Sequence, residues 1–342
     1  MIRVYLDKLM YSPFDFPDFD TAFAKSNITI TKSVSNAHII MSSYKNILEK
    51  YVSEWGSKKK YLLWTHEPYH NWSYDKKISS NSKPTNPIHI MNCYTSDVFT
   101  HNHRYFYFRN KIETPVILPT LTLTPPTGLQ PTATPTNQRL VVALSTLYEP
   151  SYYKDNKYST LPIRYKVIEE GVRREMVDVH GKGWDKHKFV RSVGNSRNDN
   201  DRRDSKLDIL KGYKFNICLE NVDFGHYVTE KIWESIKGGC VPIYYSNSTI
   251  YESLPQNSFI DVREYEIKYG DLEEGIKQMY GDLATMTEAE YQRRYQECVK
   301  GFNKIIEDGK NNMVRLHSKN LNINYVEYKT CCNALIKKLT NL

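Results

Sequence analysis

Short apolar runs alternate with longer amphipathic segments along most of this chain. An apolar run bounded by polar turn residues is typical of a buried strand, and an apolar stripe with the helical period is typical of a packed helix. In the N-terminal part, residues 44–55 have the helical pattern. Strands are predicted over Ile2–Leu6, Ile28–Thr31, His38–Met41, Tyr61–Thr65, His89–Tyr94 and Pro115–Leu118.

From residue 139 onward, strands and helices alternate more regularly. Strands are predicted over Leu140–Leu144, Val177–His180, Phe215–Leu219, Cys240–Tyr245 and Phe259–Val262. Helices are predicted over 163–175, over 205–211 and over 271–307. A further helix is predicted between the strands Phe215–Leu219 and Cys240–Tyr245. Apolar strands that alternate with helices indicate a parallel sheet covered on both faces.

A Pro/Thr-rich stretch, residues 119–138, has neither period and is typical of a linker. The sequence therefore predicts a two-lobed α/β protein. The predicted parts are an N-terminal lobe (1–118), the linker (119–138), a C-terminal lobe (139–310) and a helical tail (311–342). Ligands of such sheets bind beyond the carboxyl ends of the strands, which directs attention to the residues that follow each strand.

Composition adds a preference for anionic partners. Of the 342 residues, 25% are charged and 40% hydrophobic, as in globular proteins, and the formal net charge is +8. A positive balance favours nucleotides, nucleic acid or acidic surfaces without choosing among them. No signal peptide or transmembrane run is visible and the six cysteines lack metal-binding spacing, so we expect a cytoplasmic protein with reduced thiols and no metal site.

The stretch GHYVTEKIWESIKGGCVPIYY, residues 225–245, predicts a helix that leads into a buried strand. Lys231 lies in the first turn, where the partial positive charge of the helix disfavours a cation, and only Glu230 beside it compensates. The helix follows the predicted strand that ends at Glu220-Asn221. Free backbone N–H groups at such a helix start bind phosphate oxygens, so a pyrophosphate there would make Lys231 a ligand.

The segment YKFNICLENVDFGHYVTEKIW, residues 213–233, resembles the donor-binding signature of the α-1,3-fucosyltransferases, glycosyltransferase family 10. The following GGCVPIYY and the segment SLPQNSFIDVREY, residues 253–265, are similar to the family's continuation. The resemblance implies two Rossmann-like lobes facing a cleft, the GT-B type of glycosyltransferase architecture. It also implies an acceptor-binding lobe first and a GDP-fucose-binding lobe second.

The resemblance also implies roles for individual donor-site residues. Asn221 would contact the nucleotide, Tyr227 and Glu230 would face the ribose and fucose, and Lys231 would contact the pyrophosphate. Arg164 matches an arginine that grips the pyrophosphate in the family, although the same position also suits an exposed helix residue.

The catalytic base is implied to follow an N-lobe strand. Glu67 in LLWTHEPYHNW, residues 62–72, occupies this place, and His66 is the alternative base or a partner of Glu67. The implied reaction is inverting transfer of L-fucose from GDP-β-L-fucose to a glycan hydroxyl, in an α-1,3 linkage to an acceptor that contains N-acetylglucosamine. Protein cations would hold the departing diphosphate, so no metal is obligatory, although Mg²⁺ or Mn²⁺ on the diphosphate would be compatible with stimulation.

Two other functions stay open at this point. One is a two-lobed glycosyltransferase that uses a different sugar nucleotide. The other is a basic nucleic-acid-binding protein, suggested by the positive charge and the 27 tyrosines, but the chain carries no RNP, KH or zinc signature. We therefore expect no nucleic-acid partner, and the acceptor and the oligomeric state are not specified by the sequence.

Overall fold

The structure is a computed structural model. It describes residues 1–9, 14, 19–65, 70–92, 140–190, 192–194, 204–224, 227–245, 248–310, 313–316 and 321–342. The predicted strand at Pro115–Leu118, the linker 119–138, His66 and Glu67 lie outside these residues.

The N-terminal lobe is built on a six-stranded sheet with the order β2-β1-β3-β4-β6-β5. Its strands are β1 (Ile2–Asp7), β2 (Ile28–Ile30), β3 (Ile39–Ser42), β4 (Lys60–Thr65), β5 (Lys77–Ser79) and β6 (Pro87–Asn92). Neighbouring strands run parallel, except that β5 pairs antiparallel with β6 at one edge. The carboxyl ends of β3 and β4 therefore lie at the same edge of the sheet.

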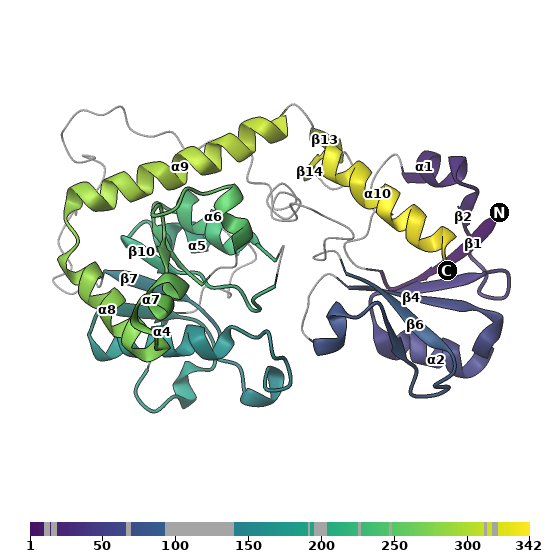
Figure 1. The fold of residues 1–342 in the computed structure, drawn as a ribbon, viewed down its shortest axis with the longest axis horizontal. Coiled ribbons are helices and arrows are strands. Elements are labelled where there is room, and N and C mark those ends of the chain that lie inside the picture. The colour runs from purple at the N-terminus through teal and green to yellow at the C-terminus, as the bar shows by residue number, and fades with distance from the viewer. Residues whose placement is uncertain are drawn as a thin grey trace.

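Helices cover both faces of this sheet. On one face α2 (Lys45–Trp55) buries Leu48 and Val52 against strand residues such as Ile40 and Leu63. The other face is covered by α1 (Phe19–Lys25) and by α10 (Tyr325–Thr340), which comes from the far end of the sequence (Figure 1). The α10 side chains Cys332, Leu335 and Leu339 are buried there.

The C-terminal lobe is built on a second six-stranded sheet, with the order β12-β11-β10-β7-β8-β9. Its strands are β7 (Val141–Leu144), β8 (Val177–His180), β9 (Ser192–Gly194), β10 (Phe215–Ile217), β11 (Val241–Tyr244) and β12 (Ile260–Asp261). All neighbouring pairs are parallel. The centre of the sheet is formed by β10 and β7, which are neighbours in space and far apart in sequence.

Five helices pack on this sheet. The first face carries α4 (Leu161–Arg173) and α8 (Leu272–Thr285). The opposite face carries α5 (Asp204–Leu210), α6 (Glu230–Lys237) and α9 (Glu288–Lys310). A short helix, α7 (Val262–Tyr269), follows β12 directly. The pattern in β7 shows the two faces, because Val141 and Ala143 pack in the α4/α8 cluster whereas Val142 packs with Leu210 of α5.

This architecture confirms the predicted two-lobed α/β fold. The segment after α9 forms an antiparallel pair of strands, β13 (Met313–Leu316) and β14 (Leu321–Asn324), before α10 begins. Within the described ranges, no helix combines the length and the apolar character needed to cross a bilayer.

Candidate functional site

Two helix N-termini meet at the carboxyl end of β10. The N-cap residue of α4 is Thr160, whose hydroxyl donates a hydrogen bond to the carbonyl of Glu220 and whose amide donates to the carbonyl of Asn221 at 3.1 Å. The N-cap residue of α6 is Thr229, whose amide donates to the Glu220 carboxylate at 2.7 Å. The short loop after β10 is therefore the point at which the positive ends of both helices converge.

Glu220 is the centre of a buried hydrogen-bond network. Its side chain is 2% exposed, yet its two carboxylate oxygens accept four hydrogen bonds. The donors are the Thr229 amide and hydroxyl (both 2.7 Å), the Lys231 ammonium (3.0 Å) and the Tyr244 hydroxyl (3.1 Å). Burial, followed by the adjacent Glu220 charge, raises the pKa of Tyr244, so this hydroxyl stays protonated and donates. A charge buried this deeply is tolerated because its lone pairs are satisfied.

The network explains why a helix can begin with a lysine. The Lys231 ammonium lies 3.0 Å from Glu220 and 2.8 Å from the Thr229 hydroxyl, and it lies 3.8 Å from Glu230. Glu220, from the preceding strand end, is therefore a closer counter-ion than Glu230, the neighbour in sequence. The Lys231 side chain is still 25% exposed, so a ligand can reach it.

Glu230 carries a stable negative charge beside this lysine. Burial alone would raise the pKa of its carboxyl group, but the positive charges of Lys231 and Lys206 lower the pKa to about 2. Its side chain is 28% exposed. The carboxylate therefore stays ionised at neutral pH, next to the position where the sequence predicts a sugar.

Arg164 projects from α4 into the same loop. It is only 6% exposed, and its guanidinium Nη2 donates to the Leu219 carbonyl and to the Asn221 side-chain oxygen, the latter at 3.0 Å. Its buried Nε has no hydrogen-bond partner among the described residues. Burial lowers the pKa of the guanidinium, and nearby groups, among them Glu220, partly offset this effect. The guanidinium therefore lies inside the site, and the alternative of an exposed helix residue does not apply.

The Tyr227 side chain is almost completely buried, more than contact with a ligand alone would require. It is 1% exposed and packs in a cluster that includes Val222 and residues of the N-terminal lobe. Its amide donates to the Phe224 carbonyl at 2.9 Å, which closes the loop that leads into α6. The predicted contact of Tyr227 with ribose or fucose stays a prediction.

Three further residues gather at neighbouring strand ends. The Arg263 guanidinium, at the start of α7, pairs with Asp223 and stacks over the Tyr245 ring at 4.5 Å. Asp223 follows β10, Tyr245 follows β11 and Arg263 follows β12. Sequence reasoning assigned no role to these three or to Glu220. The available signal was position, because each lies within six residues after the end of a strand of a parallel sheet.

The structure thus brings together Arg164, Asn221, Glu230 and Lys231 around one loop. The implied base, Glu67, and its alternative, His66, follow β4 of the other lobe and lie outside the described residues. Among the residues that the structure does describe, no group of three or more His, Cys, Asp or Glu side chains is arranged to hold a metal ion.

Two lobes built on largely parallel sheets, with the cations Arg164 and Lys231 at the carboxyl edge of the second sheet, agree with the GT-B type of architecture predicted from the sequence. Residues 156–301 match the family model described as glycosyltransferase family 10 (fucosyltransferase), C-terminal part. The match covers less than half of the chain, and it shows that this segment is similar to the C-terminal part of the family 10 fucosyltransferases. The matched segment contains Arg164, Asn221, Glu230 and Lys231 but not Glu67.

Individual relatives match over shorter stretches. GDP-fucose protein O-fucosyltransferase 3 of Rattus norvegicus is 34% identical over 99 residues, which cover 26% of this chain and 20% of the relative. An α-(1,3)-fucosyltransferase of Helicobacter pylori is 34% identical over 62 residues, which cover 18% of this chain and 13% of the relative. A solved α1,3-fucosyltransferase with GDP-fucose has a TM-score of 0.42 and 15% identity, with 90% of each chain covered. The chain spans about a fifth or less of the length of the first curated relatives.

Proposed function

We propose that this protein transfers L-fucose from GDP-β-L-fucose to a hydroxyl of a glycan acceptor, with inversion at the anomeric carbon. The observation that carries the proposal is the cluster of Arg164, Asn221 and Lys231 around the loop after β10, inside the family 10 segment. An α-1,3 linkage to an acceptor containing N-acetylglucosamine is the finer form of the same proposal.

Holding the departing diphosphate is the task that this cluster fits. As the bond between the anomeric carbon and the phosphate oxygen breaks, negative charge builds on GDP. The Arg164 guanidinium, the Lys231 ammonium and the N-termini of α4 and α6 place positive charge at one loop before any substrate arrives. Preorganised charge of this kind stabilises a transition state more than mobile solvent does. A metal is therefore not obligatory in the proposal, and stimulation by Mg²⁺ or Mn²⁺ would act on the diphosphate.

The acceptor hydroxyl has to lose a proton as its oxygen bonds to the sugar. We assign that proton to the Glu67 carboxylate, which follows β4, with His66 as the competing assignment. The sugar passes through an oxocarbenium-like state with positive charge at the anomeric carbon. Glu230, ionised at neutral pH, would stabilise this charge if it faces the fucose as proposed.

Nucleotide selectivity tests the donor assignment. A ligand that binds only the folded state raises the melting temperature, so GDP should stabilise the protein whereas UDP and dTDP should not. GDP-fucose should also hydrolyse slowly without an acceptor. Stabilisation by UDP or dTDP in place of GDP would instead support a glycosyltransferase with a different donor.

An acceptor panel with mass spectrometry tests the transfer itself. It should contain N-acetylglucosamine-containing oligosaccharides and, because several relatives are named protein O-fucosyltransferases, a Ser/Thr-containing peptide. Fucose on an oligosaccharide supports the proposal, and fucose only on the peptide replaces the glycan acceptor with a protein. The cytoplasmic setting stays a prediction, to be checked by locating the tagged protein in its own cells.

A further inference from the structure

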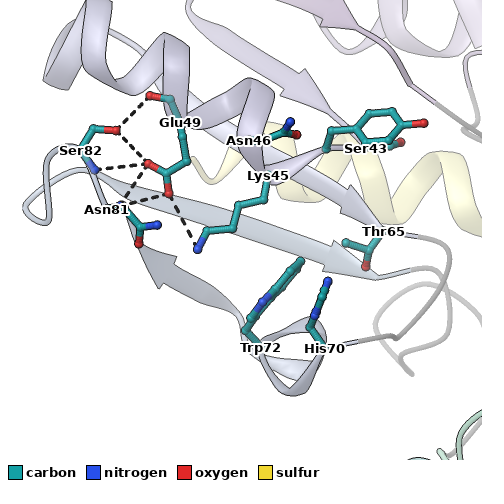
Figure 2. A pocket seen from close by; sticks show the side chains of 10 residues that line it. Ser43, Lys45, Asn46, Glu49, Thr65, His70, Trp72, Asn81 and Ser82 are labelled. Carbon is teal, nitrogen blue, oxygen red and sulfur yellow. Dashed lines mark hydrogen bonds and ion pairs between the residues drawn. The ribbon is translucent and has the colours of Figure 1, made fainter. Parts of the chain in front are cut away.

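A pocket of about 720 Å³ lies in the N-terminal lobe at the carboxyl ends of β3 and β4. The first turn of α2 and its neighbours form one wall, and His70 and Trp72 form the other (Figure 2). Its lining includes Lys45, Glu49, Thr65, His70, Trp72 and Asn81. This is the edge of a parallel sheet at which ligands bind, and the donor cluster described above does not use it.

Lys45 lies in the first turn of α2, where the helix N-terminus disfavours a cation. The first turn contains no acidic residue, and no side chain caps the helix at Tyr44. Among the described residues, the carboxylate within ion-pair distance of Lys45 is Glu49, at 3.9 Å, which is beyond hydrogen-bond distance. The charge of Lys45 therefore has only a weak internal counterpart.

The Glu49 carboxylate is hydrogen-bonded by the loop that follows β5. It accepts hydrogen bonds from the amides of Asn81 and Ser82 and from the Ser82 hydroxyl (Figure 2). It also accepts one from the Ser80 hydroxyl. Burial alone would raise the pKa of Glu49, but these hydrogen bonds lower it. Glu49 therefore holds the loop after β5 against α2, and its contact with Lys45, at 3.9 Å, is the longer one.

The opposite wall is aromatic. The His70 and Trp72 rings stack with their centroids 4.7 Å apart and an interplanar angle of 20°. Partial burial and then the charge of Lys45 lower the pKa of His70, so the imidazole is neutral at pH 7. Figure 2 shows these rings rising from the short helix η3 (Asn71–Tyr74), on the side of the pocket opposite Lys45. A flat aromatic wall suits the apolar C–H face of a sugar ring.

The pocket also contains an unsatisfied polar group. Thr65, at the end of β4, lines the pocket and is only 6% exposed, and its hydroxyl has no hydrogen-bond partner among the described residues. Leaving a buried hydroxyl unpaired costs about 1–3 kcal/mol, and a ligand that hydrogen-bonds to Thr65 would remove this cost.

The pocket is tied to the donor lobe through Asn71, which lies between the two stacked rings in sequence. Its side-chain amide donates to the Asp155 carbonyl, and its side-chain oxygen accepts from the Lys157 amide at 3.0 Å. Residues 155 and 157 lead into α4, the helix that carries Arg164. A molecule in the pocket would therefore lie on the side of the N-terminal lobe that contacts the donor lobe.

We propose that this pocket binds the acceptor, and that the acceptor is an anionic sugar whose ring lies against the His70–Trp72 stack and whose acidic group pairs with Lys45. The proposal rests on the proposed function, since it names the class of acceptor. The acidic group is a carboxylate or a sulfate, because both offer the charged oxygen atoms that an ammonium and a helix N-terminus bind.

The test compares binding of three disaccharides to the full chain by titration calorimetry, with and without GDP. They are neutral N-acetyllactosamine, its 6-O-sulfated form, and a disaccharide with glucuronic acid in place of galactose. At least one anionic sugar should bind roughly tenfold more tightly than the neutral one, the scale of one hydrogen bond to a charged group. The sugar that binds more tightly shows whether the acidic group is a carboxylate or a sulfate.

Substitutions assign the preference to the pocket. Lys45→Gln should reduce it to about twofold or less, because the amide keeps hydrogen bonding but loses the charge, whereas Lys45→Arg should retain it. The matched control is Lys50→Gln, which removes an exposed lysine of the same helix outside the pocket and should change nothing. His70→Ala should weaken neutral and anionic sugars alike, by roughly two- to tenfold.

Three results would overturn the proposal: equal affinity for neutral and anionic sugars, a preference that survives Lys45→Gln, or no binding of any sugar by the folded protein. GDP is titrated separately. A protein that prefers anionic sugars but ignores GDP would refute the donor assignment and leave the pocket assignment standing. The reverse result would refute only the pocket.

Discussion

The two lobes each place a lysine in the first turn of a helix that follows a parallel strand, but they treat its charge differently. In the C-terminal lobe, Lys231 is held at 3.0 Å by Glu220, a carboxylate that is 2% exposed. In the N-terminal lobe, Lys45 lies 3.9 Å from Glu49, whose oxygens are occupied by the loop after β5. A lysine in the first turn of a helix thus belongs to a complete hydrogen-bond network in the C-terminal lobe. In the N-terminal lobe its charge has only a weak counter-ion among the described residues.

This difference has a physical consequence for ligand binding. A ligand at Lys231 enters a site whose geometry is already fixed, so it gains positioning but must share the ammonium with Glu220. A ligand at Lys45 meets a charge whose nearest carboxylate among the described residues lies 3.9 Å away, so there is less internal competition for the ammonium. Under the two proposals made above, the C-terminal lobe orients its ligand and the N-terminal lobe selects its ligand by charge.

The largest expected effect concerns Glu67, the proposed catalytic base. Glu67→Gln keeps the shape of the side chain but cannot accept a proton, so the fucose-transfer rate should fall by roughly 10²–10⁴-fold. GDP affinity should hardly change, because the donor cluster lies on the other lobe. Rate measurements across pH give a second readout, since the ascending limb due to the base should vanish in the variant.

His66→Asn is the matched control for Glu67. If the histidine is the base, this variant should lose the ascending limb of the pH profile and Glu67→Gln should retain it. If both variants transfer fucose at nearly the wild-type rate, the base lies elsewhere and the comparison between lobes no longer includes catalysis.

Removal of Lys231 should give the next largest effect. Lys231→Ala should lower turnover by roughly 10²–10³-fold, the scale for losing one charge-stabilising group. The free protein should also lose stability, because Glu220 is a fixed partner of Lys231. The variant should lose about 1–3 kcal/mol in the free energy of unfolding, since a buried carboxylate loses one of its donors.

Urea denaturation measures the stability change, and GDP-fucose turnover measures the catalytic one. Lys237→Ala, in the last turn of the same helix, removes a lysine outside the network and serves as the control. Normal turnover in the Lys231 variant would mean that the network is purely structural, and the contrast with Lys45 would then concern stability alone.

The smallest expected effect concerns Glu230, whose pKa lies at about 2 in the folded protein and near 4.5 in the unfolded chain. A depressed pKa contributes stability that is complete above the unfolded value and is lost as pH falls from about 4.5 toward 2. Because the side chain is partly exposed, solvent screening reduces the effect to about 1 kcal/mol. The free energy of unfolding of Glu230→Gln should thus depend less on pH between 5 and 3, as urea titrations at both pH values would show. An unchanged dependence would mean that Lys231 and Lys206 do not hold this charge.

Local pattern predicted the sheet strands and the site loop well. The strand runs ending at Thr65 and Leu144 and the helix over residues 44–55 agree with β4, β7 and α2, because each is defined by its own apolar pattern. Asn221 and Lys231 could be placed in the site because they follow a strand and begin a helix. The sequence left open whether Arg164 faces the site or the solvent, because its low exposure of 6% results from three-dimensional packing.

The remaining features depend on contacts between distant parts of the sequence. Glu220 stood in the motif, but its four donors come from α6, its N-cap and β11, which no local period reveals. The sequence does not single out Lys45, because its weak pairing with Glu49 becomes visible only when residues 80–82 are seen to hydrogen-bond the Glu49 carboxylate. Nor does a helical pattern near residue 330 indicate which sheet that helix covers.

That last point bears on how the protein is made. The apolar face of the N-terminal sheet, with Met41, Leu62 and Trp64, is closed by Cys332, Leu335 and Leu339 of α10 (Figure 1). A ribosome adds about 5–20 residues per second, so on the order of ten seconds or more pass between the synthesis of this sheet and the synthesis of α10. The donor lobe, whose strands and helices lie between β7 and α9 in the sequence, can complete its core first. We therefore expect the lobe made first to be the lobe that finishes folding last, and to depend on chaperones in the interval.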